Sequence, residues 1–151
     1  MRTKSTLLIL TFFLISIMSF AQKKKNASMN IISGKVNISK YHNHDDLDRM
    51  SKGELLTLYT ERIKVIVNIL PNIAFATKPG ITMSDLGIPD TKENKKALEN
   101  NLEASDNYFE STIEFQKTVL PYSDTRDLIA AILFYEETLK SLHTYNDYKT
   151  D

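Results

Sequence analysis

Three stretches of the chain carry apolar residues three or four positions apart, the spacing that places side chains on one face of an α-helix. Ser51 and Glu54 form a capping-box pattern before the first stretch, and Pro71 and Pro121 end the first and second. The helical stripes comprise Leu55, Tyr59, Ile63, Ile66 and Leu70, then Leu98, Leu102, Ser105, Phe109, Thr112, Gln116 and Val119, and finally Leu128, Ile132, Tyr135, Leu139 and Leu142. The pattern predicts an all-α fold, an antiparallel three-helix bundle.

The connection between the first two predicted helices, residues 71–89, is unusually long and apolar. It contains three of the four prolines and six large apolar residues, namely Ile73, Phe75, Ile81, Met83, Leu86 and Ile88. We expect this 71–89 loop to cap one end of the bundle, with Thr82–Leu86 as a short helical turn ended by Gly87. It is either a structural lid over the core or a functional loop.

The first 21 residues have the three parts of a signal peptide. Arg2 and Lys4 precede an apolar run from Leu7 to Phe20, and Ala21 supplies a small residue at the expected cleavage point. The phrase Ser19-Phe20-Ala21-Gln22 resembles signal endings of exported Bacteroidota proteins. We therefore expect residues 1–21 to be removed and the protein to be exported, to the periplasm or the medium of a Gram-negative bacterium. No stable membrane span is expected after cleavage, because the run is shorter than the roughly 20 apolar residues of a spanning helix.

The remaining chain divides by composition and charge. Residues 22–50 are polar and irregular, and we expect a flexible basic tether followed by a helical bundle domain over residues 51–148. From Lys23 to Lys52 there are 7 basic and 3 acidic residues, a net charge of +4, whereas Gly53 to Asp151 hold 10 basic and 16 acidic, a net charge of −6. Apolar residues on both sides of Ser33 and Gly34 are also compatible with a short hairpin in this tether.

Candidate chemistry is sparse. The chain has no cysteine, which excludes disulfides, thiolate nucleophiles and Cys–zinc sites, and its near-neutral charge argues against nucleic acid as the main partner. No phosphate-binding glycine loop, serine-nucleophile motif or His-Glu-x-x-His motif occurs. His42 and His44, followed by acidic residues, are the densest set of candidate metal ligands, but a solvated polar segment is the preferred interpretation, because nothing predicts a rigid frame around them.

Glu136 and His143 are the other candidate pair. They lie two turns apart on the third predicted helix, and a carboxylate with an imidazole can perform acid–base chemistry. Glu136 and Lys140 alternatively form an ordinary surface ion pair, with His143 placed favourably near the helix end.

These features predict a non-enzymatic exported protein that binds another macromolecule, a protein or an envelope component, through the 71–89 loop or a helix face. No catalytic residue, cofactor or resident metal is expected, and the sequence leaves the oligomeric state open. One alternative is a module for a small ligand or divalent metal, using His42 and His44 or a tyrosine-rich surface. A second alternative is an enzyme that uses Glu136 and His143.

Overall fold

The computed structural model describes residues 29–142, 144 and 145, and this part of the chain is all-α. It contains a short helix α2 (His44–Asp48) and three long helices, α3 (Lys52–Ile69), α4 (Lys92–Val119) and α5 (Thr125–Ser141). Single 3-10 turns follow or connect them at η2 (Leu70–Asn72), η3 (Ser84–Leu86) and η4 (Leu120–Tyr122). Among these residues no helix combines the length and apolarity needed to cross a membrane. The predicted signal, residues 1–21, and His143 lie outside the described residues.

The long helices begin where the sequence predicts. The Ser51 hydroxyl accepts a hydrogen bond from the Glu54 backbone, and the Glu54 carboxylate accepts one from the Ser51 N–H at 2.7 Å. Thr91 and Asp124 cap α4 and α5 without a reciprocal contact, because their side-chain oxygens accept hydrogen bonds from the backbone N–H groups of Asn94 and Arg126. These caps satisfy backbone amides that have no partner within the helix, and they fix the helix starts.

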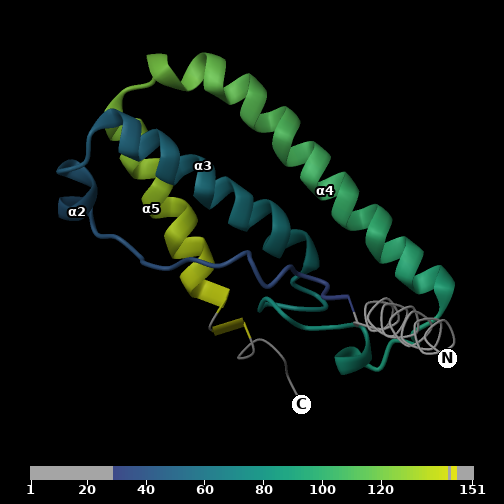
Figure 1. Cartoon of the computed structure of the whole chain (residues 1–151). Coiled ribbons are helices and arrows are strands. Elements are labelled where there is room, and N and C mark those ends of the chain that lie inside the picture. Colours follow the sequence, from purple (N-terminus) through teal and green to yellow (C-terminus); the bar gives the residue numbers. More distant parts are fainter. Residues whose placement is uncertain (1–28, 143, 146–151) are drawn as a thin grey trace, which may run out of the picture.

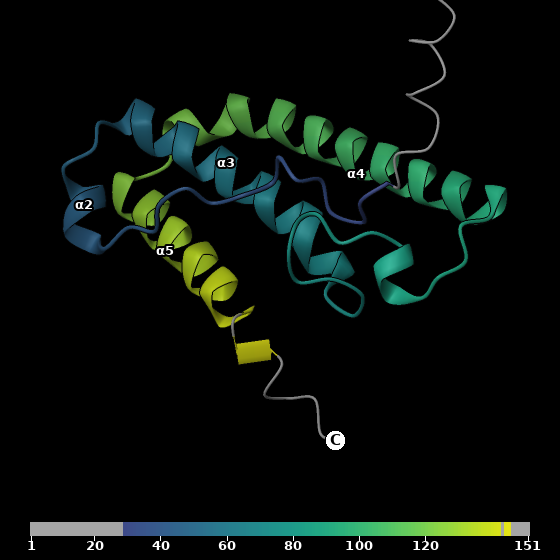
Figure 2. The same ribbon diagram turned by 60° about the horizontal axis from the view of Figure 1, so that its bottom comes forward.

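The three long helices pack unequally. α3 and α5 run parallel and have the most extensive contact, while α4 runs back along α3 and meets α5 only sparsely within the described residues (Figure 1). Figure 2 shows α4 extending beyond the end of α3, towards the 71–89 loop. The all-α prediction is therefore confirmed, but a closed three-helix bundle is not. The reason is that the 28-residue α4 covers the loop with its first half instead of packing along α5.

Residues 29–43 form an extended segment, here called the strap, that packs against the helices. Its apolar residues Ile31, Ile32 and Val36 are buried in the core. The strap pairs with the 71–89 loop, where the Ile31 N–H donates to the Ile81 carbonyl at 2.8 Å, so the hairpin considered for this region is not formed. Residues 29–50 of the expected tether are thus packed in place, because burial of these side chains offsets the entropy of ordering the segment.

A short helix after the strap was not anticipated. Asn43 caps α2 in a capping box with Asp46, and the helix buries Leu47 completely. The Asn43-x-x-Asp46 spacing is itself a helix-start signal, so the sequence contained the information for this element.

Two apolar clusters form the core. One cluster lies at the start of α3 and α5, and its fully buried members are Leu47, Leu55, Leu128, Ile129 and Ile132. The other lies where the strap, the loop and the three long helices meet, and it contains Ile31, Ile32, Val36, Val65, Ile69, Ala76, Met83, Leu98 and Leu139. Along both α3 and α5, the residues between these clusters include buried charges.

The 71–89 loop is folded over the second cluster. Met83 and Ala76 are buried, η3 forms the predicted short turn, and Gly87 ends it in the left-handed conformation at φ +70°. Phe75 nevertheless remains 60% exposed. The loop therefore covers the core and also presents a large apolar side chain to solvent.

Candidate functional site

The buried charges form one cluster, here called the charged cluster, of Arg62 on α3, Glu136 on α5 and His42 on the strap. Glu136 is 0% exposed and Arg62 is 1% exposed. The Arg62 Nε donates to Glu136 Oε1 at 2.8 Å, and the His42 Nδ1 lies 2.9 Å from the same oxygen. The His42 backbone N–H donates to Glu136 Oε2 at 2.5 Å. Each carboxylate oxygen of Glu136 is therefore in contact with at least one group from another element.

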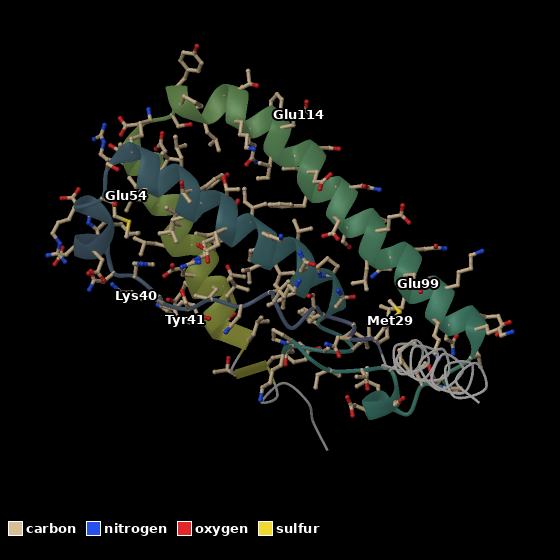
Figure 3. All side chains as sticks on the ribbon, in the orientation of Figure 1. Met29, Lys40, Tyr41, Glu54, Glu99 and Glu114 are labelled. Atoms are coloured by element: carbon tan, nitrogen blue, oxygen red, sulfur yellow. The ribbon has the colours of Figure 1, made fainter. Side chains whose placement is uncertain are left out.

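The environment of Glu136 favours its charged form. Burial raises the pKa of this carboxyl, but the hydrogen bonds from His42 and then Arg62 outweigh burial and hold the pKa below its usual value. Arg62 also donates from Nη2 to the Lys40 carbonyl at 2.8 Å. The charged cluster thus attaches the strap to α3 and α5 at the point where Lys40 and Tyr41 pass the helices (Figure 3).

Two tyrosines are close in sequence to the charged cluster. Tyr135 comes one residue before Glu136, and Tyr59 comes three residues before Arg62. The rings of Tyr59 and Tyr135 have centroids 5.7 Å apart. Burial, together with the hydrogen bond to Tyr59, raises the pKa of Tyr135 to about 12. Tyr135 is therefore a neutral phenol near neutral pH, which fits a packing role between helices.

The cluster has the parts of an acid–base dyad, but its side chains are almost completely enclosed. A carboxylate bound to Nδ1 is the usual device for orienting a catalytic imidazole. The His42 side chain is only 8% exposed, however, and neither His42 nor Glu136 lines any of the described clefts. The arrangement is suited to holding three elements together.

The sequence-based interpretation of Glu136 as part of a surface ion pair is wrong. Glu136 is buried, and Lys140 pairs instead with the exposed neighbour Glu137, at 3.4 Å. Its other proposed partner, His143, lies outside the described residues. The Glu136 carboxylate already binds His42 and Arg62, which sequence spacing could not reveal because both partners are far away along the chain.

His42 and His44 are not brought together as metal ligands. The His42 ring turns towards Glu136, while His44 is the exposed first residue of α2. Within the described part of the chain, no three His, Asp or Glu side chains gather closely enough to hold a metal ion.

A second candidate site is the apolar groove between the loop side of α3 and one flank of α4, here called the loop groove. Two depressions follow each other along α4, of about 270 and 260 Å³. Their lining residues include Val67, Pro71, Asn72 and Phe75 on one side and Ala97, Asn101, Ala104, Ser105 and Tyr108 on the other. Tyr108 is 63% exposed.

The loop-groove flank of α4 has a regular pattern of its own. Ala97, Asn101, Ala104 and Tyr108 recur at spacings of four, three and four, beside the buried stripe that begins at Leu98. Such spacing would pack a further helix or chain segment along α4. Glu99 and Glu114, by contrast, are exposed charged residues of α4 (Figure 3).

Comparison with known proteins identifies no relative: no protein-family model, curated protein or solved structure matches this chain.

Proposed function

We propose that this protein is a non-enzymatic binding protein that holds an apolar segment of another protein in the loop groove. The observation that carries the proposal is the pair of aromatic side chains at the groove, Phe75 and Tyr108, which are 60% and 63% exposed. Exposed aromatic side chains beside a groove are typical anchors of protein–protein contacts. In this proposal the three long helices serve as an antiparallel three-helix scaffold.

The dimensions of the groove favour a chain-like partner. Each depression is smaller than the roughly 300–1,000 Å³ of sites that enclose a drug-sized molecule. Each is suited to one or two side chains, and together they would receive successive residues of a helix or extended segment.

The chemistry of the groove favours an apolar partner. Its lining residues carry no charge, and the polar members are Asn72, Asn94, Asn101 and Ser105, with the Tyr108 hydroxyl. A strongly charged segment would lose its hydration there without gaining an ion pair. We therefore expect anchors such as Leu, Ile or Phe in the partner.

The expected place of action is outside the cytoplasm. The support comes from the pattern of residues 1–21, and the binding partner would then be an envelope or secreted protein. N-terminal sequencing of protein isolated from the producing cell tests this part separately, since a product that begins at Met1 contradicts it.

Site-specific photo-crosslinking in the native cell tests the proposed function. A benzophenone amino acid is placed at Phe75, at Tyr108 or, as the matched control, at Phe134, which is 68% exposed on α5. We expect the same adduct from the first two positions and none from the third.

Groove specificity is tested by a charge placed within it. Ala104→Glu should abolish the adduct, whereas Asn107→Glu, at an exposed position of the same helix outside the groove, should leave it intact. Equal crosslinking at Phe134, or an adduct unaffected by Ala104→Glu, would contradict the proposal.

A further inference from the structure

A third cavity lies between the strap and the ends of α3 and α5. This strap cleft has a volume of about 210 Å³ and is formed by four elements: the strap, the 71–89 loop, α3 and the end of α5. Its apolar lining comprises Val36, Ile38, Val65, Ile69, Pro79, Leu139 and Leu142. Its polar lining residues are Asn37, Tyr41, Thr77 and Lys78.

The charge of the strap cleft is one-sided. Lys78 is the single charged residue of the lining, it is exposed, and it forms no ion pair with any described residue. A second cation lies beside the cleft, because the Lys140 Nζ is 5.4 Å from the centre of the Tyr41 ring, but this ammonium also pairs with the exposed Glu137 carboxylate at 3.4 Å. Among the described residues, no carboxylate lines the cleft. An anionic group at the mouth would therefore meet Lys78 without competition from an acid in that lining.

The size of the strap cleft limits the ligand. An apolar cavity of about 150 Å³ is sufficient for benzene, whereas drug-sized ligands need about 300 Å³ or more. The 210 Å³ here corresponds to a short aliphatic chain, with the head group left at the open rim.

We infer that the strap cleft binds a small monocarboxylate with an aliphatic tail, with the tail on the apolar floor and the carboxylate at Lys78. Burial of the tail supplies most of the affinity, and the lysine selects the anionic head group over a neutral one. The strap cleft is separate from the loop groove, so this inference does not depend on the proposed protein partner.

Calorimetric titration of the protein, produced from the full-length sequence, with octanoate and with octan-1-ol tests the inference. Octanoate should bind with 1:1 stoichiometry. Lys78→Glu should weaken octanoate binding about threefold or more and leave octanol binding unchanged, because one exposed charge contact is replaced by a repulsive one. Lys96→Glu is the matched control on α4 and should change neither.

A plug variant and a map of the contacts complete the test. Thr77→Trp should weaken both ligands about tenfold by filling the mouth, with circular dichroism to show that its helices are retained. Methyl NMR shifts should concentrate at Ile38 and Leu139. The inference is overturned if millimolar octanoate does not bind, if Lys78→Glu and Lys96→Glu behave alike, or if the shifts lie at the loop groove.

Discussion

The two sides of α3 are stabilised in different ways. On the side facing α5 and the strap, Arg62 is buried and its guanidinium binds Glu136 and the Lys40 carbonyl. On the side facing α4 and the loop, Phe75 and Tyr108 lie beside an open apolar groove. The first side thus encloses charged groups that are normally exposed, and the second exposes aromatic groups that are normally enclosed.

This contrast distinguishes the charged cluster, which stabilises the fold, from the loop groove, which is exposed for binding. Burying an ion pair between apolar clusters is costly, and it is tolerated only when hydrogen bonds satisfy the charged groups. His42 and Arg62 meet that condition for the Glu136 carboxylate, and in doing so they set where the strap lies, whereas Arg62 Nη1 has no hydrogen-bond partner among the described residues and lies 3.4 Å from Glu61 Oε1. Among the described residues, the exposed aromatic side chains Phe75 and Tyr108 have no comparable partners, and their surfaces face solvent.

The largest effect is expected from removing the carboxylate of the charged cluster. Glu136→Leu leaves the buried Arg62 without its main counter-ion, and we expect a loss of about 3–5 kcal/mol in the free energy of unfolding. Glu137→Leu, at the exposed neighbouring position, should change it by less than about 0.5 kcal/mol. Urea denaturation followed by circular dichroism measures both.

The double variant Arg62→Met/Glu136→Leu tells whether the loss comes from an unpaired charge. Replacing both partners by apolar residues of similar size is often neutral or stabilising, so the double variant should recover most of the stability lost in Glu136→Leu. If Glu136→Leu costs no more than Glu137→Leu, the charged cluster does not stabilise this side of α3.

A smaller loss is expected at the strap. His42→Ala removes the ring contact to Glu136 but keeps the backbone one, so we expect to lose about 1.5–3 kcal/mol, the range for a hydrogen bond to a charged group. Trypsin should then cleave faster after Lys35 and Lys40, because the strap detaches more readily. His44→Ala is the matched control, and equal proteolysis of the two variants would show that His42 does not fasten the strap.

Lowering the pH should also destabilise the side of α3 that faces α5 and the strap, by less than His42→Ala does. The Glu136 carboxyl has a pKa below its ordinary 4.5 in the folded protein, so its contribution is complete above that value and declines as the pH falls through the folded pKa. The exposed capping carboxylates, such as Glu54, also have lowered pKa values and add their own acid dependence. The unfolding free energy of the natural protein should therefore fall more steeply towards about pH 3 than that of Arg62→Met/Glu136→Leu. Parallel curves would contradict this assignment.

Local sequence signals predict the helices well. The capping residues Ser51 and Glu54, the 3.6-residue periodicity and the prolines act over a few neighbouring positions, and the structure places the corresponding helix ends accordingly. The turn before Gly87 follows from the same kind of local signal. Phe134, beside Tyr135 of the apolar stripe of α5, is exposed, because periodicity does not reveal how wide the buried face is.

Long-range pairing was beyond the reach of the sequence. Glu136 and His42 are 94 positions apart, and nothing local to either residue indicates the other. Arg62 offered one signal, since it lies seven positions from both Leu55 and Ile69, which are buried. A charged residue on the apolar face of a helix suggests a buried partner of opposite charge, but it does not identify that partner.

Substitutions on the side of α3 that faces α4 and the loop should have the smallest effect on stability and the largest effect on partner binding. Phe75→Ser and Tyr108→Ser replace side chains that already face water, so each should change the free energy of unfolding by less than about 0.5 kcal/mol. Phe75→Ser should nevertheless remove the adduct formed from a crosslinker at Tyr108, and Tyr108→Ser should remove the adduct formed from a crosslinker at Phe75. In each case an anchor of the groove is lost. Met83→Ser is the matched control on the loop, since it lies in the core and should destabilise the protein. If Phe75→Ser destabilises the protein as much as Met83→Ser does, the Phe75 ring stabilises the fold, and the main argument for the loop groove as a binding site is lost.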